Sequence, residues 1–369
     1  MDFKRRIPDT LGNLAFLLNL DLSRNKLDGR IPDSLGNLTS LSYLYLSNNI
    51  LEGRIPDSFG NLATLLELHV SYNNLDGRIP DSFGNLTSLS YFSLSRNILE
   101  GRIPNFLGNL ASLLHLDLSY NKLDGRIPSA LGNLVSLTYM DLHENKLEKR
   151  IPESFGNLTS LVRLDLSSNM LEGGIPVTMR NMTKLSDLDL SNNMFQGRIP
   201  NSLGNLVSLS SLDLSNNMFE GSIPDAFWTL SSLSHLNISN NKIFDSFPKN
   251  SSSLSSIDMS HNQIFGHVPD LSSNFPELRT LDLSFNEFNG WVPHFPPILE
   301  TLNLRKNKIS GKLNGICSDI NISDTDPYTL ALLNVSDNLL SGELPTCLHN
   351  FVSLQYLNLA NNNLSGDVG

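Results

Sequence analysis

The sequence lacks features that membrane-spanning, secreted and nucleic-acid-binding chains usually carry. No stretch approaches the roughly 18 uninterrupted apolar residues of a transmembrane helix. No apolar run follows the charged start Met1–Arg6, so the sequence predicts no signal peptide. Basic residues are few, 26 Lys and Arg against 37 Asp and Glu, for a net charge of −11. This balance argues against nucleic acid or an anionic membrane as the partner.

Motifs that carry chemistry are missing as well. The sequence contains no HRD, no DFG and no glycine-rich phosphate loop, which are the elements of a kinase. Its eight His and two Cys residues are scattered without the spacing of metal ligands. The sequence therefore predicts a protein that is not an enzyme and that uses neither a cofactor nor a metal.

One phrase, Leu-x-x-Leu-x-Leu-x-x-Asn, occurs fifteen times, for example at Leu113–Asn121. The first ten of its Asn residues, from Asn25 to Asn241, follow one another at intervals of 24 residues. Such a period predicts a solenoid, because a single coil cannot bury its apolar side without stacked neighbours. We expect one domain over residues 1–369, with about 15 repeats and no cap at either end.

Each coil is expected to follow the same path. The Leu positions and the Asn should point inward, with the Asn amide hydrogen-bonded to the backbone of adjacent turns. After the Asn, Gly125 permits a turn, Pro128 suits a sheet edge or a first helical turn, and the Ser or Asp after such a Pro suits a turn or a cap. The expected fold is a right-handed α/β solenoid with short parallel strands on the concave face and few true helices. An acidic insert at 318–329 should form a loop.

The second half of each repeat, Leu-x-Gly-x-Ile-Pro-x-x-Leu-Gly-Asn-Leu, closely resembles the plant-specific leucine-rich repeat over essentially the whole chain. Families with this repeat include plant receptor-like kinases, receptor-like proteins and polygalacturonase-inhibiting proteins, and the passage Ser341–Cys347 is most similar to receptor-like proteins. The resemblance implies extracellular ligand recognition at the plasma membrane, in defence or development, with a co-receptor kinase. The alternatives are a soluble inhibitor of microbial cell-wall hydrolases and a truncated, non-signalling remnant or decoy.

Outward residues at the same offset should form columns, because neighbouring strands lie roughly 4.8 Å apart. Tyr and Arg often anchor interfaces, and they gather in the N-terminal half of the chain. We predict that a peptide, protein or glycan ligand binds there, although these rings would also serve simply to cover the sheet. The predicted ligand-binding residues are Tyr43, Tyr45, Glu67, His69, Tyr72, Tyr91, Arg96, His115, Asp117, Tyr139, Asp141, His143 and Arg163.

A second column consists of aspartates, from Asp117 at 24-residue intervals to Asp213. Like charges at this spacing repel one another, and a basic ligand group would relieve the repulsion. The other explanation is that Leu-Asp-Leu-Ser is simply the ordinary phrase of the repeat.

Two kinds of covalent modification are predicted. Cys317 and Cys347 stand ten and nine residues after their Asn in adjacent coils, which favours a disulfide and an oxidising compartment. Nine Asn-x-Ser/Thr sequons suggest a glycoprotein; they start at Asn37, Asn85, Asn157, Asn181, Asn237, Asn250, Asn321, Asn334 and Asn363.

Overall fold

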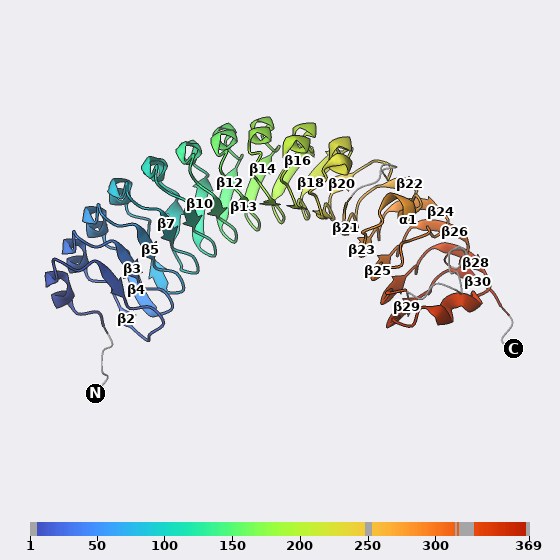
Figure 1. The fold of residues 1–369 in the computed structure, drawn as a ribbon, viewed down its shortest axis with the longest axis horizontal. Helices are drawn as coiled ribbons and strands as arrows, with labels where there is room; N and C mark the ends of the chain where they lie inside the picture. The colour runs from blue at the N-terminus through green and yellow to red at the C-terminus, as the bar shows by residue number, and fades with distance from the viewer. Residues whose placement is uncertain (1–5, 248–252, 314–315, 317–327, 367–369) are drawn as a thin grey trace. The chain divides into compact units, whose positions relative to one another are not determined.

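The computed structural model describes residues 6–247, 253–313, 316 and 328–366. These residues form two compact units, unit 1 over Met1–Phe195 and unit 2 over Gln196–Gly369. Each unit is built from coils that carry a short strand, a second extended segment and a tight helical turn (Figure 1). The expected α/β solenoid of parallel strands with few true helices is confirmed.

Unit 1 has a sheet of parallel three-residue strands, one from each coil. These are β1 (Asn19–Asp21), β3 (Tyr43–Tyr45), β5 (Glu67–His69), β7 (Tyr91–Ser93), β9 (His115–Asp117), β11 (Tyr139–Asp141), β13 (Arg163–Asp165) and β15 (Asp187–Asp189). Their central residues are buried and the residues on either side face outward, as at Asn19–Asp21. We call the outward side of these strands the strand face.

Second extended segments and 3-10 turns complete the coils of unit 1. The segments are β2 (Asp28–Gly29), β4 (Ile50–Arg54), β6 (Asn74–Asp76), β8 (Glu100–Arg102), β10 (Lys122–Arg126), β12 (Lys146–Lys149) and β14 (Met170–Gly173), with β16 (Met194–Arg198) at the division. The 3-10 turns are η1 (Asp9–Asn13), η2 (Asp33–Asn37), η3 (Asp57–Asn61), η4 (Asp81–Asn85), η5 (Asn105–Asn109), η6 (Ser129–Asn133), η7 (Glu153–Asn157) and η8 (Val177–Asn181). In unit 1 these turns lie on the side of the coil away from the strand face (Figure 1).

Unit 2 repeats this plan with less regular spacing. Its first strands are β17 (Ser211–Asp213), β19 (His235–Asn237), β21 (Ser256–Asp258), β23 (Thr280–Asp282), β25 (Thr301–Asn303), β27 (Leu332–Asn334) and β29 (Tyr356–Asn358). Its second segments are β18 (Met218–Gly221), β20 (Lys242–Ile243), β22 (Phe265–His267), β24 (Glu287–Gly290), β26 (Lys308–Lys312), β28 (Leu339–Gly342) and β30 (Asn363–Leu364). The helical turns are η9 (Asn201–Asn205), η10 (Asp225–Thr229), α1 (Leu271–Asn274) and η12 (Thr346–Asn350). Of the predicted loop at 318–329, only residues 328 and 329 fall within the described residues.

The inward Asn residues form the expected ladder. Asn121 donates its amide to the carbonyl of Leu94 in the preceding coil, at 3.1 Å, and to the carbonyl of Leu118 in its own coil, at 3.2 Å. Its Oδ1 accepts the backbone N–H of Leu99 at 3.0 Å. Each amide therefore bonds two coils, which stabilises their stacking because a buried amide without partners would be costly.

A tight turn before each ladder Asn was not expected. The residue immediately before the Asn has a positive φ in every coil, for example Tyr72 at 56°, Arg96 at 53° and Tyr120 at 50°. Non-glycine residues pay roughly 1–2 kcal/mol for this conformation. The backbone N–H of Tyr120 donates to the carbonyl of His143 in the next coil at 2.9 Å, so the cost is offset by a bond between coils.

The expected side-chain caps are absent from the described 3-10 turns. The capping position of η3 is Pro56 itself, and no side chain accepts a hydrogen bond there. The Ser58 hydroxyl instead donates to the backbone carbonyl of Asp33 in the preceding coil at 2.7 Å. A side-chain cap does occur at α1, where Asp270 accepts the backbone N–H groups of Ser272 and Ser273. The hydroxyl of the second residue after the Pro therefore bonds neighbouring coils and does not cap the helical turn.

Candidate ligand-binding surface

The strand face of unit 1 brings most of the predicted ligand-binding residues into two columns. Each residue of the first column is paired with the next one on the neighbouring strand; the column consists of Tyr43, Glu67, Tyr91, His115, Tyr139, Arg163 and Asp187. The second column, two residues further along each strand, runs Tyr45, His69, Ser93, Asp117, Asp141, Asp165 and Asp189. Parallel pairing without a register shift therefore places equivalent side chains side by side.

Four rings of these columns form a continuous stack. His69 lies 4.1 Å from Tyr91, Tyr91 lies 4.0 Å from His115, and His115 lies 4.1 Å from Tyr139, all measured between ring centroids. The planes of neighbouring rings differ by 10° or less. Both faces of Tyr91 and His115 are therefore covered by neighbouring rings, and only their edges and polar atoms remain for a ligand.

Burial in this stack changes the acidity of its members. Burial raises the pKa of the Tyr91 hydroxyl, and the nearby carboxylates of Asp117 and Glu67 add to the shift. Burial lowers the pKa of the His115 imidazole below its ordinary value of 6.5, although Asp117 opposes the shift. The centre of the stack therefore favours neutral side chains.

A polar cluster stands at the N-terminal end of the stack. The Tyr45 hydroxyl donates to the Glu67 carboxylate at 2.8 Å, and Nε2 of His69 lies 3.1 Å from the same oxygen. Burial and this hydrogen bond raise the pKa of Tyr45 to about 12. Glu67 therefore holds the rings of Tyr45 and His69 in place, and those rings lie 4.8 Å apart.

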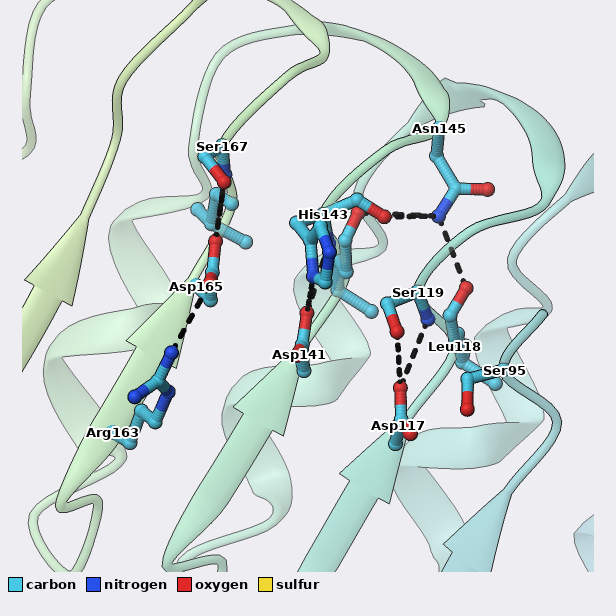
Figure 2. Close-up of polar contacts among 12 residues, drawn as sticks. Ser95, Asp117, Leu118, Ser119, Asp141, His143, Asn145, Arg163, Asp165 and Ser167 are labelled. Carbon is cyan, nitrogen blue, oxygen red and sulfur yellow. Dashed lines mark hydrogen bonds and ion pairs between the residues drawn. The ribbon is translucent and has the colours of Figure 1, made fainter. Parts of the chain in front are cut away.

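The aspartates of the second column are engaged by their own strands. Asp117 Oδ1 accepts the backbone N–H of Ser119 at 3.1 Å and its hydroxyl at 2.6 Å, and Asp165 receives the same two bonds from Ser167 (Figure 2). Asp165 also pairs with Arg163 at 3.5 Å. These bonds give the Leu-Asp-Leu-Ser phrase a structural role at the end of the strand.

Asp141 carries the most elaborate contacts of the column. It accepts hydrogen bonds from the Tyr139 hydroxyl at 3.0 Å and from the His143 backbone N–H at 3.1 Å, and Nδ1 of His143 lies 2.6 Å from its Oδ1. Burial alone would raise the pKa of Asp141, but the bonds from His143 outweigh it and hold this pKa below 3.8. The same contact with Asp141 raises the pKa of His143 above 6.5. The pair therefore favours an imidazolium beside a carboxylate.

Asp141, His143 and Asp165 also have the composition of a metal site, since their ligand atoms lie within 4.8 Å of one another. All three groups are already partnered: His143 with Asp141, and Asp165 with Ser167 and Arg163 (Figure 2). The Arg163 cation would repel a metal ion. We therefore assign no metal to this cluster.

A third column comes from the positive-φ residues beside the strand face. The guanidinium of Arg96 lies 5.1 Å from the ring centroid of Tyr72 and 3.8 Å from that of Tyr120, so it is held between two aromatic rings. Tyr120 in turn meets the ring of His143 edge-on at 4.4 Å. The predicted residues Tyr72 and Arg96 thus belong to a row linked to the second column through His143.

Two members of this surface are absent from the predicted set of ligand-binding residues. Tyr120 flanks the same columns in the sequence, at the spacing of Tyr72 and Arg96, but was not included in that set. Asp165 is 5% exposed and pairs with Arg163, yet it was considered only as part of a repeated aspartate motif. Tyr43, by contrast, lies apart from the stack, with its ring 6.4 Å from that of Tyr45.

The predicted modification sites fall in different settings. Cys347 is disulfide-bonded, and Cys317 lies outside the described residues, as do Asn250 and Asn321. Five sequon asparagines are exposed: Asn37, Asn85, Asn157, Asn181 and Asn363. Asn237 is half-buried and donates to Asp213 at 3.0 Å, whereas Asn334 is only 8% exposed and accepts from Ser336. Burial of Asn334 argues against a glycan on the strand face there.

Two family models match the chain. A model described as leucine-rich repeat region matches residues 97–289, and a model described as leucine rich repeat matches residues 16–38, 40–62, 64–86 and 353–368. A comparison with curated protein sequences finds no match. No helix among the described residues combines the length and the apolar character needed to cross a bilayer.

Several solved plant receptors are similar in structure. The plant peptide hormone receptor RGFR1, in complex with RGF2, shares 33% identity with a TM-score of 0.86, over 98% of this chain and 62% of that one. The Arabidopsis receptor kinase HAESA, in complex with the peptide hormone IDA and the co-receptor SERK1, shares 31% identity with a TM-score of 0.72, over 98% and 77%. A TDR receptor shares 29% identity with a TM-score of 0.74, over 95% and 69%. The chain spans less than two thirds of the length of RGFR1.

Proposed function

Because the chain belongs to the leucine-rich-repeat family, with repeats of the plant receptor type, we propose that it recognises an extracellular peptide through the strand face of unit 1. The peptide-bound complexes of RGFR1 and HAESA support a peptide ligand, and the presence of SERK1 in the HAESA complex supports a co-receptor kinase as a further partner. The proposed location is the extracellular face of the plasma membrane. This receptor fold is typically non-enzymatic.

The ring stack from His69 to Tyr139 carries the proposal. Aromatic rings that bind sugars do so through open faces, but both faces of Tyr91 and His115 are covered by neighbouring rings at 4.0–4.1 Å. Ring edges and polar atoms remain available, which suits the side chains and backbone amides of an extended peptide. The stack therefore favours a peptide over a glycan.

The surroundings of the stack describe the peptide more closely. Asp117, Asp141 and Asp165 lie beside it on consecutive strands, with His143 paired to Asp141 and Arg163 paired to Asp165. The balance beside the rings is negative, so a ligand with a basic side chain next to an apolar or aromatic one fits this surface.

A selection experiment tests the proposal. A random peptide library is displayed and selected on the full chain, and each enriched peptide is then measured on two variants. Tyr91→Ala with Tyr139→Ala should weaken binding more than tenfold, because loss of a buried anchor commonly costs about 2 kcal/mol or more. Ser211→Ala with Thr280→Ala, the matched pair from the first column of unit 2, should change it little.

Folding is controlled by circular dichroism and by the melting temperature of each variant. Equal losses from the two pairs, with both variants folded, would show that the rings only cover the sheet. Tyr139→Phe separates the two contributions of Tyr139, since it keeps the ring in the stack but removes the hydroxyl that donates to Asp141.

A further inference from the structure

A row of arginines runs along unit 1 away from the strand face. We call it the Arg ladder; its members are Arg30, Arg54, Arg78, Arg102, Arg126 and Arg150, at intervals of 24 residues. All six side chains are exposed. None makes a side-chain hydrogen bond or an ion pair to any residue that the structure describes. The ladder therefore presents guanidinium groups whose donors face solvent.

A glycine in the following coil borders the stem of five of the six arginines, and Arg126 is the exception because Lys149 replaces the glycine there. A Cβ on Gly125 would lie 3.1 Å from Cγ of Arg102, so only a glycine leaves the stem its present place. Gly125 also has a φ of 71°, which independently favours glycine there. The stem of Arg102 is thus supported by backbone, although its guanidinium has no partner among the described residues.

Four successive grooves lie between the coils of the ladder. The first, of about 590 Å³, is lined by Arg30 and Arg54 with the carboxylates of Asp33, Asp57 and Asp76. The second, of about 760 Å³, is lined by Arg54 and Arg78 with Asp57, Asp81 and Glu100. The third, of about 400 Å³, is lined by Arg78 and Arg102 with Asp81 and Asp124. The fourth, of about 450 Å³, is lined by Arg102 and Arg126 with Asn105, Ser129, Ile103, Pro104 and Pro128.

The charge of these grooves changes along the ladder. The first two each combine two arginines with three carboxylates, the third combines two with two, and the fourth has two arginines and no carboxylate. Two positions supply these carboxylates. The residue after the Pro is Asp in η2, η3 and η4 but Asn105 in η5 and Ser129 in η6. The residue before the turn glycine lines only the first three grooves, as Asp76, Glu100 and Asp124. The backbone plan is the same throughout, so the charge difference comes from the side chains.

We propose that the fourth groove binds an oxyanion, the carboxylate, sulfate or phosphate group of a ligand. Arg102 and Arg126 stand on the neighbouring strands β8 and β10, and both side chains line the fourth groove. We therefore expect their planar guanidinium forks to bind one anion together. The amide of Asn105 and the hydroxyl of Ser129 add neutral donors in the same groove. Neither side chain is bonded to another described residue.

Two effects oppose the binding of an anion in the fourth groove, and we expect both to be weaker than its attraction to the two guanidinium groups. The net charge of −11 repels anions from the whole chain, but at physiological salt such repulsion is screened over about 8 Å. In the register of the strands, Asp124 is paired with Arg102 and Glu148 is paired with Arg126. Neither carboxylate lines the fourth groove. An anion between the two guanidinium groups is therefore closer to the cations than to either carboxylate.

Calorimetric titration of the full chain at physiological ionic strength tests the site, with sodium sulfate, sodium phosphate and trigalacturonate as probes. At least one probe should bind, and Arg102→Gln with Arg126→Gln should weaken it by about tenfold or more, because charge-assisted hydrogen bonds are lost. Asn105→Asp should weaken it similarly. That variant should fold, since Asp occupies the same position in η2, η3 and η4.

Arg54→Gln with Arg78→Gln is the matched control in the second groove and should leave binding unchanged. Binding of trigalacturonate alone would identify a sugar-borne carboxylate, whereas sulfate or phosphate binding would identify the free or ester-borne ions. Absence of binding for all three probes would overturn the proposal. Equal losses from the control pair and from the Arg102 and Arg126 pair would overturn it as well.

Discussion

The strand faces of units 1 and 2 carry different chemistry on the same backbone plan. The first column of unit 1 contains Tyr91, His115 and Tyr139 in a stack, whereas the equivalent column of unit 2 places Thr280 beside Ser256, joined by a hydroxyl hydrogen bond of 2.7 Å. The central residue of each odd-numbered strand from β3 to β27 is buried and apolar in both units. Inward and outward side chains alternate along each strand, so the outward residues can differ between the units without disturbing the core.

Carboxylates show the same contrast. Burial raises the pKa of Asp258 in unit 2, and its bonds from Ser260 only reduce that rise. The pKa of Asp141 in unit 1 is lowered instead, because His143 donates to it. The pKa of an aspartate at this repeated position therefore depends on its burial and on the side chains that bond to it, and not on the repeat alone.

The largest expected effect should be equal in the two units. Asn121→Ala removes an acceptor from the backbone N–H of Leu99 and leaves the carbonyls of Leu94 and Leu118 without that donor. We expect destabilisation of roughly 3 kcal/mol, since each unsatisfied buried group costs about 1–3 kcal/mol. Asn286→Ala in unit 2 should cost the same, because its bonds match those of Asn121.

Hydrogen exchange at the amides of Leu99 and Ile264, which bond to the two asparagines, reports each unit separately. A repeat protein can open in parts, so this local measurement is preferable to a single melting temperature. A much larger effect in one unit than in the other would contradict the shared ladder.

A smaller effect should distinguish the two strand faces. His115→Ala takes the ring from between Tyr91 and Tyr139 and should destabilise unit 1 by about 1–3 kcal/mol, because aromatic pairs add about 0.5–1.5 kcal/mol each to area burial. Ser256→Ala, at the equivalent position of unit 2, loses only its bond with Thr280 and should cost at most about 1 kcal/mol. Urea unfolding monitored by local exchange would compare them, and similar losses would mean that the stack adds no stability.

His143 and His115 of unit 1 should respond to pH in opposite directions. The pKa of His143 is raised above 6.5 by Asp141, so its stabilising effect is present below pH 6.5 and is lost as the pH rises through the raised value. The pKa of His115 is lowered below 6.5 by burial, so stability is lost as the pH falls below 6.5. The charged groups that act on the two imidazoles are Asp117 and Asp141 for both, together with Asp165 for His143 and His69 for His115.

Unfolding of wild type, His143→Gln and His115→Gln across this pH range checks the signs. His143→Gln should flatten the loss on the alkaline side, and His115→Gln should flatten the loss on the acid side. NMR titration of the two imidazoles gives the values directly, and a His115 that titrates above His143 would contradict the assignment.

The smallest effects concern the two coils that lack the turn glycine. Lys149 in unit 1 keeps the positive φ of that glycine, at 71°, while Asp245 in unit 2 is not among the positive-φ residues and accepts the N–H of Ile223 at 2.9 Å. Lys149→Gly should change stability by less than about 1 kcal/mol, because relief of strain is offset by the flexibility of glycine. Asp245→Gly should destabilise by about 1 kcal/mol through the lost bond. Denaturant titration of both variants would detect a reversal of this order.

The regular sequence period made the fold predictable. Leu and Asn at fixed offsets determine which residues are buried, and the Asn ladder follows from the need to satisfy an inward amide. The positive φ at Tyr72, Arg96 and Tyr120 could not be foreseen, because any residue type occupies that position and the compensating bond comes from the next coil. For the same reason the contact of Arg96 with two rings was not evident from its own repeat.

The candidate surface was predictable only as a set of columns. Repeated spacing placed Tyr91, His115 and Tyr139 side by side, but ring orientation depends on packing that spacing does not determine. The Asp-x-Ser spacing at Asp117 and Ser119 did contain a usable signal, since an aspartate often accepts the N–H two residues later. The fourth groove needed the structure, because its lining joins residues of two different coils.

The Asn ladder also constrains how this gene can change in length. Each amide reaches a carbonyl one coil back, as Asn121 reaches Leu94, so every bond survives the loss or gain of a whole 24-residue period. A coil of another length can keep the same bonds, since Asn262, only 21 residues after Asn241, still donates to the carbonyl of Ile238 and accepts the N–H of Ile243. Unequal recombination between repeats can therefore lengthen or shorten the molecule in whole steps, and each added step supplies one more row of outward side chains for selection to alter.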